Sequence, residues 1–506
     1  MKKIKHDDQA TPGYNNYIPE KIMTPDIVNT RIGTLTFFDG MPDDTTVSMV
    51  FDNLDFLRGV ETFLNGIPAT SLEGIRLGMA EMGAEKFNQC LIFDELMDSN
   101  PLFLTGNTDT VYASVILDLK EGPTIVEIPP ECGPGTVNDA FFRFVVDMGA
   151  PGPDKGNGGM YMILPPDYEG ELKPTEGDEP VEVEIGGKMQ AVYISQSTSY
   201  INWLILRGFL VDGKPDTSSN MFRNGLKIYP QSQAENPPAM EFIEGSKEVF
   251  NTIHANDFEF YEELNIVIQR EPISMLDPEL RGLFAAIGIQ KDKAFEPSPR
   301  LKGILTDAVA VGNATARANW LRPRIEGARL YGEESGWCTA FVGGDYQWLK
   351  DGGLGGRFLD ARTLFFYMAT VNTPAMAAKN VGVGSQYAMN YTDSNGDYLY
   401  GDKSYKLTIP ANPPAQDFWS VVVYDPQTRS ELQTSQEFPS KNSEKAGFDE
   451  SKPVTLFFGP DCPEGAENNW IQTAPGKGWF VTLRLYGPGE EWFDQTWRPG
   501  EIEPVV

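Results

Sequence analysis

The sequence predicts a mainly β protein with helical segments, in which a helical connector joins two antiparallel, jelly-roll-like β-sandwich domains. Short apolar runs separated by glycine and proline clusters fill two long stretches of the 506-residue chain. Between these stretches, apolar residues recur at helical spacing. A chain of this length is expected to divide into two to four domains rather than to build one core.

Composition shifts along the chain predict five successive segments. They are an N-terminal arm (1–35), a helical segment (36–100), a first β domain (101–239), a helical connector (240–330) and a second β domain (331–506).

The helical segment follows a short strand that we expect at Thr34–Phe38. Apolar residues at helical spacing predict one helix from about residue 42 to residue 64. Asn65-Gly66 is a helix-stop signal, and Ser71 is a cap for a second helix that runs through Met82.

The first β domain is organised around Phe103–Tyr112, which packs short polar side chains directly before a strand. No helix-length pattern intervenes up to residue 229, so the connections are expected to be hairpins and the sheet mostly antiparallel. The last stretch, 200–210, also allows a short helix, although its composition favours a strand. The expected strands are 111–119, 124–128, 141–146, 160–164, 181–185, 191–195 and 200–210.

The connector carries three helix patterns. The first has Phe258, Tyr261, Leu264 and Ile268 on one face, and Asp277-Pro278 and Ser298-Pro299 open the other two. After residue 337, β composition returns. The strands expected there are 361–368, 385–389, 404–409, 418–424, 454–458 and 479–486.

Charge and residue counts exclude several classes of function. The formal net charge of −31 disfavours nucleic acid and anionic membranes, which leaves a small-molecule ligand and a second copy of the chain as expected partners. No stretch approaches the ~20 apolar residues of a membrane span, and the N-terminal charges precede no apolar run, which predicts a cytoplasmic protein. The two histidines, His6 and His254, are too few for a three-histidine zinc site. None of the four cysteines stands in a C-x-x-C pair.

Several motifs carry a family resemblance across nearly the whole chain. They include Leu104–Tyr112, Leu359–Arg362, Asp417–Ser420, Asn469-Trp470 and Arg484–Tyr486. With these motifs the sequence resembles the bacterial family built from tandem domains of unknown function 1254 (N-terminal) and 1214 (C-terminal). The resemblance implies two sandwich-like domains with a helical link, and it implies no catalytic residues. Relatives of this kind often carry an export signal.

The first candidate site is the loop before the strand at residue 111. We expect Asp109, Tyr112, Arg143 and Arg207 to be catalytic, with Asn107 and Thr110 binding substrate. A carboxylate beside a tyrosine and an arginine can hold a small polar ligand or move a proton. Alternatively, Asn107 and Asp109 cap their own turn and the arginines form structural ion pairs.

The second candidate is a calcium site at Asp393, Asn395 and Asp397, whose oxygen side chains alternate around a glycine. The EF-hand pattern fails because Asp402 comes too early, and a plain hairpin turn explains the same residues.

The third candidate is a set of aromatic and basic residues in the second β domain that could stack on a sugar or another small ring. Its members are Tyr387, Trp419, Arg429, Trp470 and Arg484. Side chains of this kind are also common in cores.

Together these patterns predict a histidine-independent enzyme acting on a small polar or ring-containing substrate at a cleft between the β domains. The alternative is a non-catalytic protein that binds carbohydrate or another small molecule, or serves a structural role. The sequence leaves open whether the protein is an enzyme.

Overall fold

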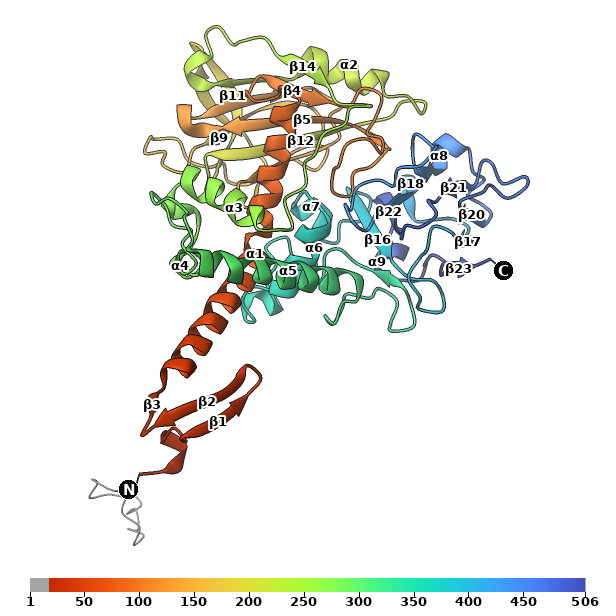
Figure 1. Ribbon diagram of the computed structural model, residues 1–506. Coiled ribbons are helices and arrows are strands. Elements are labelled where there is room, and N and C mark those ends of the chain that lie inside the picture. Colours follow the sequence, from red (N-terminus) through yellow and green to blue (C-terminus); the bar gives the residue numbers. More distant parts are fainter. Residues whose placement is uncertain (1–17, 506) are drawn as a thin grey trace, which may run out of the picture.

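A computed structural model describes residues 18–505 and confirms a mainly β protein with helical segments (Figure 1). Two β regions lie side by side, and the long helix α1 with helices α3 to α6 packs beside and between them (Figure 1). The expected arm at 1–35 is described only from residue 18, and His6 lies outside the described residues. Within residues 18–505, no helix is both long and apolar enough to cross a membrane.

The described chain begins with a small sheet of β1 (Ile27–Thr30), β2 (Gly33–Phe38) and β3 (Met41–Pro42) at the outer end of α1 (Figure 1). Helix α1 spans Asp44–Glu81, and the side chain of Asp43 caps it by accepting from Thr46 N at 2.7 Å.

The predicted break at Asn65-Gly66 is wrong, because α1 runs through it and through Pro68. Asn65 Nδ2 donates to Glu61 O at 2.8 Å inside the helix. Gly66 lies tightly under α3, where an added Cβ would stand 2.9 Å from Leu264 Cδ2. Tertiary packing therefore overrides the local stop signal.

The first β region contains a six-stranded sheet, ordered β14-β4-β5-β12-β7-β8, and a five-stranded sheet, ordered β10-β11-β9-β6-β13. At the centre of the larger sheet, β5 and β12 run antiparallel with Arg207 opposite Tyr112. Strand β12 begins at Ile201, which confirms the strand that the composition of residues 200–210 favours. The bounds are β4 (Gln89–Ile92), β5 (Thr110–Asp118), β6 (Thr124–Ile128), β7 (Pro134–Asp139), β8 (Phe144–Gly149), β9 (Gly159–Leu164), β10 (Val181–Ile185), β11 (Lys188–Gln196), β12 (Ile201–Phe209), β13 (Lys227–Pro230) and β14 (Glu241–Glu244), with helix α2 (Asp216–Gly225) before β13.

The connector has the three expected helices, α3 (Glu259–Arg270), α4 (Pro278–Ala285) and α5 (Pro299–Leu321). The strand predicted at 361–368 is wrong, because these residues belong to helix α6 (Leu359–Met368). Nearly every residue of α6 from Ala361 onward is buried, so its apolar residues show neither a helical nor an alternating period.

The second β region pairs a five-stranded sheet, ordered β15-β16-β22-β18-β19, with a four-stranded sheet, ordered β21-β20-β17-β23. The bounds are β15 (Trp337–Cys338), α7 (Pro374–Ala377), β16 (Ser385–Asn390), β17 (Tyr405–Ile409), β18 (Ala415–Tyr424), β19 (Ser440–Asn442), α8 (Ser443–Ala446), β20 (Val454–Gly459), β21 (Trp470–Gln472), β22 (Phe480–Pro488), α9 (Glu490–Phe493) and β23 (Glu503–Pro504).

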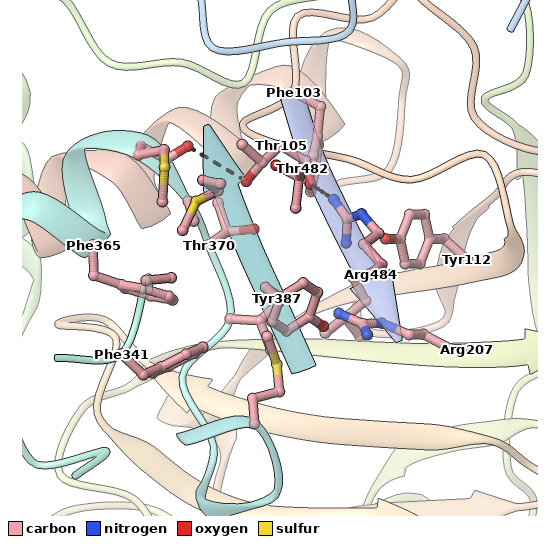
Figure 2. Close-up of a pocket in the computed structure, with 17 residues that line it drawn as sticks. Phe103, Thr105, Tyr112, Arg207, Phe341, Phe365, Thr370, Tyr387, Thr482 and Arg484 are labelled. Carbon is pink, nitrogen blue, oxygen red and sulfur yellow. Dashed lines mark hydrogen bonds between the residues drawn. The ribbon is translucent and has the colours of Figure 1, made fainter. Parts of the chain in front are cut away.

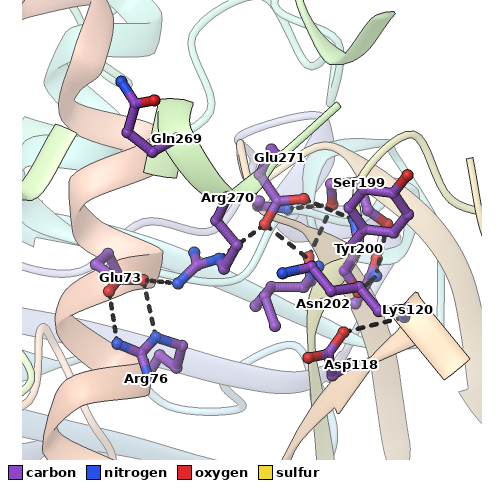
Figure 3. Close-up of polar contacts among 12 residues, drawn as sticks. Glu73, Arg76, Asp118, Lys120, Ser199, Tyr200, Asn202, Gln269, Arg270 and Glu271 are labelled. Atoms are coloured by element: carbon purple, nitrogen blue, oxygen red, sulfur yellow. Dashed lines mark hydrogen bonds and ion pairs between the residues drawn. The ribbon is translucent and has the colours of Figure 1, made fainter. Parts of the chain in front are cut away.

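A buried ionic network ties α1 and α3 to the start of β12 (Figure 3). Fully buried Glu73 pairs with Arg76 at 2.7 Å and with Arg270 at 2.8 Å. Arg270 Nε also donates to Glu271 at 3.0 Å, and Glu271 accepts from Tyr200 N at 2.6 Å. Two carboxylates and two guanidiniums thus balance their charges and fix the end of the strand that carries Arg207.

Candidate functional site

A small cavity lies between the two β regions, beside β5 and β12 of the first and β16 and β22 of the second (Figure 2). Its volume is about 40 Å³, room for about three water molecules. Tyr112, Arg207, Tyr387 and Arg484 supply its polar wall. The apolar wall includes Phe341, Phe365, Met368, Met376 and Met389, from α6, β16 and the segments flanking them.

Arg484 is held by the protein itself. Its Nη2 donates to Thr105 O at 2.7 Å, Gly106 O at 3.0 Å and Tyr424 Oη at 2.6 Å. These contacts attach β22 of the second region to the Phe103–Tyr112 stretch of the first. The guanidinium carbon lies 5.2 Å from the ring centre of Tyr387.

Arg207 differs from Arg484, because no main-chain carbonyl holds its guanidinium. The residue is only 7% exposed, and among residues 18–505 no carboxylate pairs with it; its guanidinium carbon lies 5.6 Å from the ring centre of Tyr112. It points across the cavity to the Tyr387 hydroxyl (Figure 2). A buried cation without a carboxylate partner is costly unless an anion joins it.

Tyr387 lies between the two guanidiniums (Figure 2). Burial acts to raise the pKa of Tyr387, but the charges of Arg207 and Arg484 outweigh burial and hold this pKa below its ordinary value. Burial raises the pKa of the neighbouring Tyr112 instead. Of the two hydroxyls, that of Tyr387 therefore ionises more readily, and its hydroxylate is the form that can accept a proton.

The polar side chains of the loop before β5 are bonded within the protein. Asn107 Oδ1 caps its own turn by accepting from Asp109 N at 2.9 Å and Thr110 N at 3.1 Å, and Thr110 Oγ1 donates to the same oxygen at 3.1 Å. Asp109 reaches into the second β region, where it accepts from Ser420 Oγ and from Asn442 Nδ2. None of the three lines the cavity. The catalytic and substrate-binding roles expected for these three residues stay predictions. The contacts of Asn107 are those of the alternative, in which it caps its own turn.

Four other expected site residues lie away from the cavity lining. Arg143 pairs with Asp139 at 2.7 Å, and Arg429 donates to Tyr367 O at 3.1 Å. Trp419 packs inside the second region, and Trp470 Nε1 donates to Gly459 O at 3.0 Å. These contacts fit the structural alternatives given for them.

The loop proposed for calcium is a hairpin turn. Asp393 Oδ1 accepts from Asn395 N at 2.8 Å and from Asp397 N at 3.1 Å, so its carboxylate already satisfies the turn. In the part of the chain that the structure describes, no three histidine, cysteine or acidic side chains are grouped to hold a metal. The geometry thus favours the plain hairpin at Asp393–Asp397.

Burial shifts the pKa of two further ionisable residues in the direction that favours their neutral forms. Burial, together with the charge of Arg429, lowers the pKa of His254 to about 3, and His254 Nδ1 bonds Ala255 O at 2.8 Å. This histidine lies in a loop rather than in a helix. Burial also raises the pKa of Glu431 well above its ordinary value. Neither residue lines the cavity.

An adjoining cavity of about 20 Å³ shares Arg207 and Val371 with the first. It contains Asp147, whose carboxylate accepts from Thr373 Oγ1 at 2.6 Å. Burial raises the pKa of Asp147 to about 6, against the opposing effect of this hydrogen bond. Sequence reasoning missed Asp147, as well as Phe341 and Phe365, because no local pattern marks them.

The chain is a mainly β protein with a small cavity between its two β regions. Residues 87–230 match the family model described as a protein of unknown function, DUF1254, and residues 384–490 match the one described as DUF1214. The chain therefore contains both domains that its sequence resembles, in the expected order.

The structure is similar to that of the VPA0106 protein from Vibrio parahaemolyticus, with a TM-score of 0.54 and 15% identity over 89% of this chain and 100% of that one. This likeness concerns the fold alone. An uncharacterised protein from Burkholderia cenocepacia aligns with a TM-score of 0.38 and 12% identity over 91% and 96% of the two chains. No curated protein matches the chain significantly.

Proposed function

We propose that the protein is a histidine-independent enzyme that acts on a small organic anion in the cavity between its β regions. The observation that carries this proposal is the buried guanidinium of Arg207 on the cavity wall, which has no carboxylate partner among the described residues. Such a group recognises a carboxylate by paired hydrogen bonds. The apolar wall of Phe341, Phe365 and Met389 suits a short alkyl substituent.

The size of the cavity narrows the substrate class. A volume of about 40 Å³ favours a short-chain carboxylate, of which propionate is a test case, over an aromatic or sugar ring, which needs more room. Of the two substrate types expected from the sequence, the small polar one is therefore favoured.

Tyr387 supplies the acid–base chemistry in this proposal. Its hydroxylate takes a proton from the bound anion, and the electron pair of the broken bond stays on the substrate. Arg207 then faces the additional negative charge, with Arg484 on the other side of Tyr387. Two flanking cations that favour the hydroxylate are hard to explain by packing alone.

The sandwich form of each β region belongs to the same proposal. It is supported by two buried clusters, of which the first includes Val115, Val126 and Leu204 from the six- and five-stranded sheets. The second includes Leu407, Trp419 and Leu483 from the other two sheets. The cavity lies outside both cores, where sheets of the two regions meet.

Calorimetric titration with acetate, propionate and inorganic phosphate tests the binding step. We expect propionate to bind the wild-type protein and Tyr387→Phe, but not Arg207→Met, which retains a side chain of similar reach without the charge. If Arg207→Met binds propionate as tightly as the wild type does, the proposed site is wrong.

Turnover is tested by incubating the same anions with the protein in D₂O and following their proton NMR signals. An enzyme of the proposed kind exchanges or transforms a substrate hydrogen, and Tyr387→Phe abolishes the change while retaining binding. Binding without any Tyr387-dependent change would instead support the non-catalytic alternative. The difference in absorbance near 295 nm between wild type and Tyr387→Phe reports ionisation of this tyrosine below its ordinary pKa range.

A further inference from the structure

Residues 18–58, which comprise the small sheet β1–β3 and the first turns of α1, project away from the rest of the chain (Figure 1). Thr46 is the only buried residue in this range. At the outer end, Ile27 is 66% exposed, Phe38 76% and Met41 58%. A three-stranded sheet that buries so little apolar surface is not expected to be stable without an outside surface.

The open edge of strand β1 is a place where such an outside surface can pair with the sheet. Among residues 18–505, β1 pairs with β2 alone, so its other edge is open. Asp26 O accepts from Phe37 N at 2.8 Å, and main-chain groups of alternate residues point to the same side. The N–H and C=O groups of Ile27 and Asn29 therefore face the open edge.

This edge lacks the features that usually prevent pairing between molecules. The strand Ile27-Val-Asn-Thr30 contains no charged residue, no proline and no bulge. Asp26 precedes the strand and Arg31 follows it. Antiparallel pairing of two such strands brings each Asp26 toward the Arg31 of the other copy, whereas parallel pairing places like charges together.

We propose that β1 pairs antiparallel with β1 of a second copy of this chain, so that two three-stranded sheets become one six-stranded sheet across a two-fold axis. With Val28 on the axis, Ile27 of each copy lies opposite Asn29 of the other. These two residue pairs exchange about four main-chain hydrogen bonds. The strand is complementary to itself in hydrogen bonding and in charge, which favours a second copy over an unrelated partner.

The mass of the full-length protein in solution, measured by light scattering after size exclusion, tests this pairing. We expect twice the chain mass of 56.1 kDa. Ile27→Pro removes an edge N–H while the bonds from β1 to β2 remain, so this variant should run as a monomer with unchanged far-ultraviolet circular dichroism. Ile27→Val retains the N–H and should remain a dimer.

Cross-linking tests the register independently. On the axis, the two Val28 residues form a non-hydrogen-bonded pair with Cα atoms ~4.5 Å apart, within disulfide range. Val28→Cys, in a Cys462→Ser background because the other three cysteines are buried, should oxidise to a covalent dimer, and Phe38→Cys on β2 should not. A monomeric wild type, a dimer that Ile27→Pro leaves intact, or a dimer that Val28→Cys fails to cross-link each overturns the proposal.

Discussion

Replacing Arg484 and replacing Arg207, the two buried arginines of the cavity, should change the stability of the protein in opposite directions. Arg484→Met leaves Thr105 O without its donor and removes one hydrogen bond each from Gly106 O and Tyr424 Oη, which still bond each other at 2.6 Å. At roughly 1–3 kcal/mol for the orphaned carbonyl and about 1 kcal/mol for each of the other two bonds, less the relief of removing a buried charge, we expect a loss of about 2–4 kcal/mol. Arg207→Met orphans no described acceptor and removes an unpaired buried charge. That variant should be equal to the wild type or up to about 2 kcal/mol more stable.

The assay is urea unfolding of wild type, Arg207→Met and Arg484→Met in one buffer free of carboxylates and phosphate. Both substitutions introduce the same residue into the same cavity wall, so each variant is the matched control for the other. The comparison therefore isolates what each guanidinium contacts. If Arg207→Met is destabilised as much as Arg484→Met, Arg207 serves the fold and the argument for an anion site fails.

Three further predictions concern titration and packing. Burial raises the pKa of Asp147 from 3.8 to about 6. The contribution of its protonated carboxyl to the free energy of unfolding is therefore complete below pH 3.8 and is lost as the pH rises through 6. Asp147→Asn should remove this loss and raise the free energy of unfolding by up to ~3 kcal/mol at pH 7, measured by urea unfolding across pH. The lowered pKa of Tyr387 works in the opposite direction: the stability of wild type relative to Tyr387→Phe should rise from neutral pH toward pH 10, and a flat difference would refute the shift. Gly59→Ala should lower the free energy of unfolding by ~1–3 kcal/mol, because the new Cβ would lie 2.7 Å from the Cβ of Ala308. Gly303→Ala, whose new Cβ would have nothing within 4 Å, should raise it by ~0.5–1 kcal/mol. Thermal melts of both variants can show the difference.

Where strands alternate clearly, the sequence was sufficient to locate them. The favoured strand at 200–210 is confirmed as β12. Helices α4 and α5 begin directly after the predicted caps Asp277 and Ser298, and α3 buries residues of the predicted apolar face. Helix α2 (Asp216–Gly225) lies in a stretch that was expected to hold no helix. Two other errors, at Asn65-Gly66 and in α6, fall where an element is buried on nearly all sides. In such places packing, rather than a local stop signal or an apolar period, decides the structure.

The candidate site, too, depends on packing that local sequence patterns do not encode. Tyr112, Arg207, Tyr387 and Arg484 could be singled out by residue type, but their meeting depends on how strands of two regions pack, which no local pattern encodes. Asp109 was selected for its carboxylate, and in the structure that carboxylate accepts from Ser420 and Asn442 of the second region. A polar residue that joins two regions cannot be told from a catalytic one without its partners.

A crystal structure of the wild-type protein soaked with propionate, beside Arg207→Met crystals treated identically, tests the central claim most directly. We predict density in the junction cavity, with the carboxylate ~3 Å from the Arg207 guanidinium and the ethyl group against Phe341 and Phe365, and no such density in the variant. Propionate found only on the surface, or bound equally in both crystals, would contradict the claim.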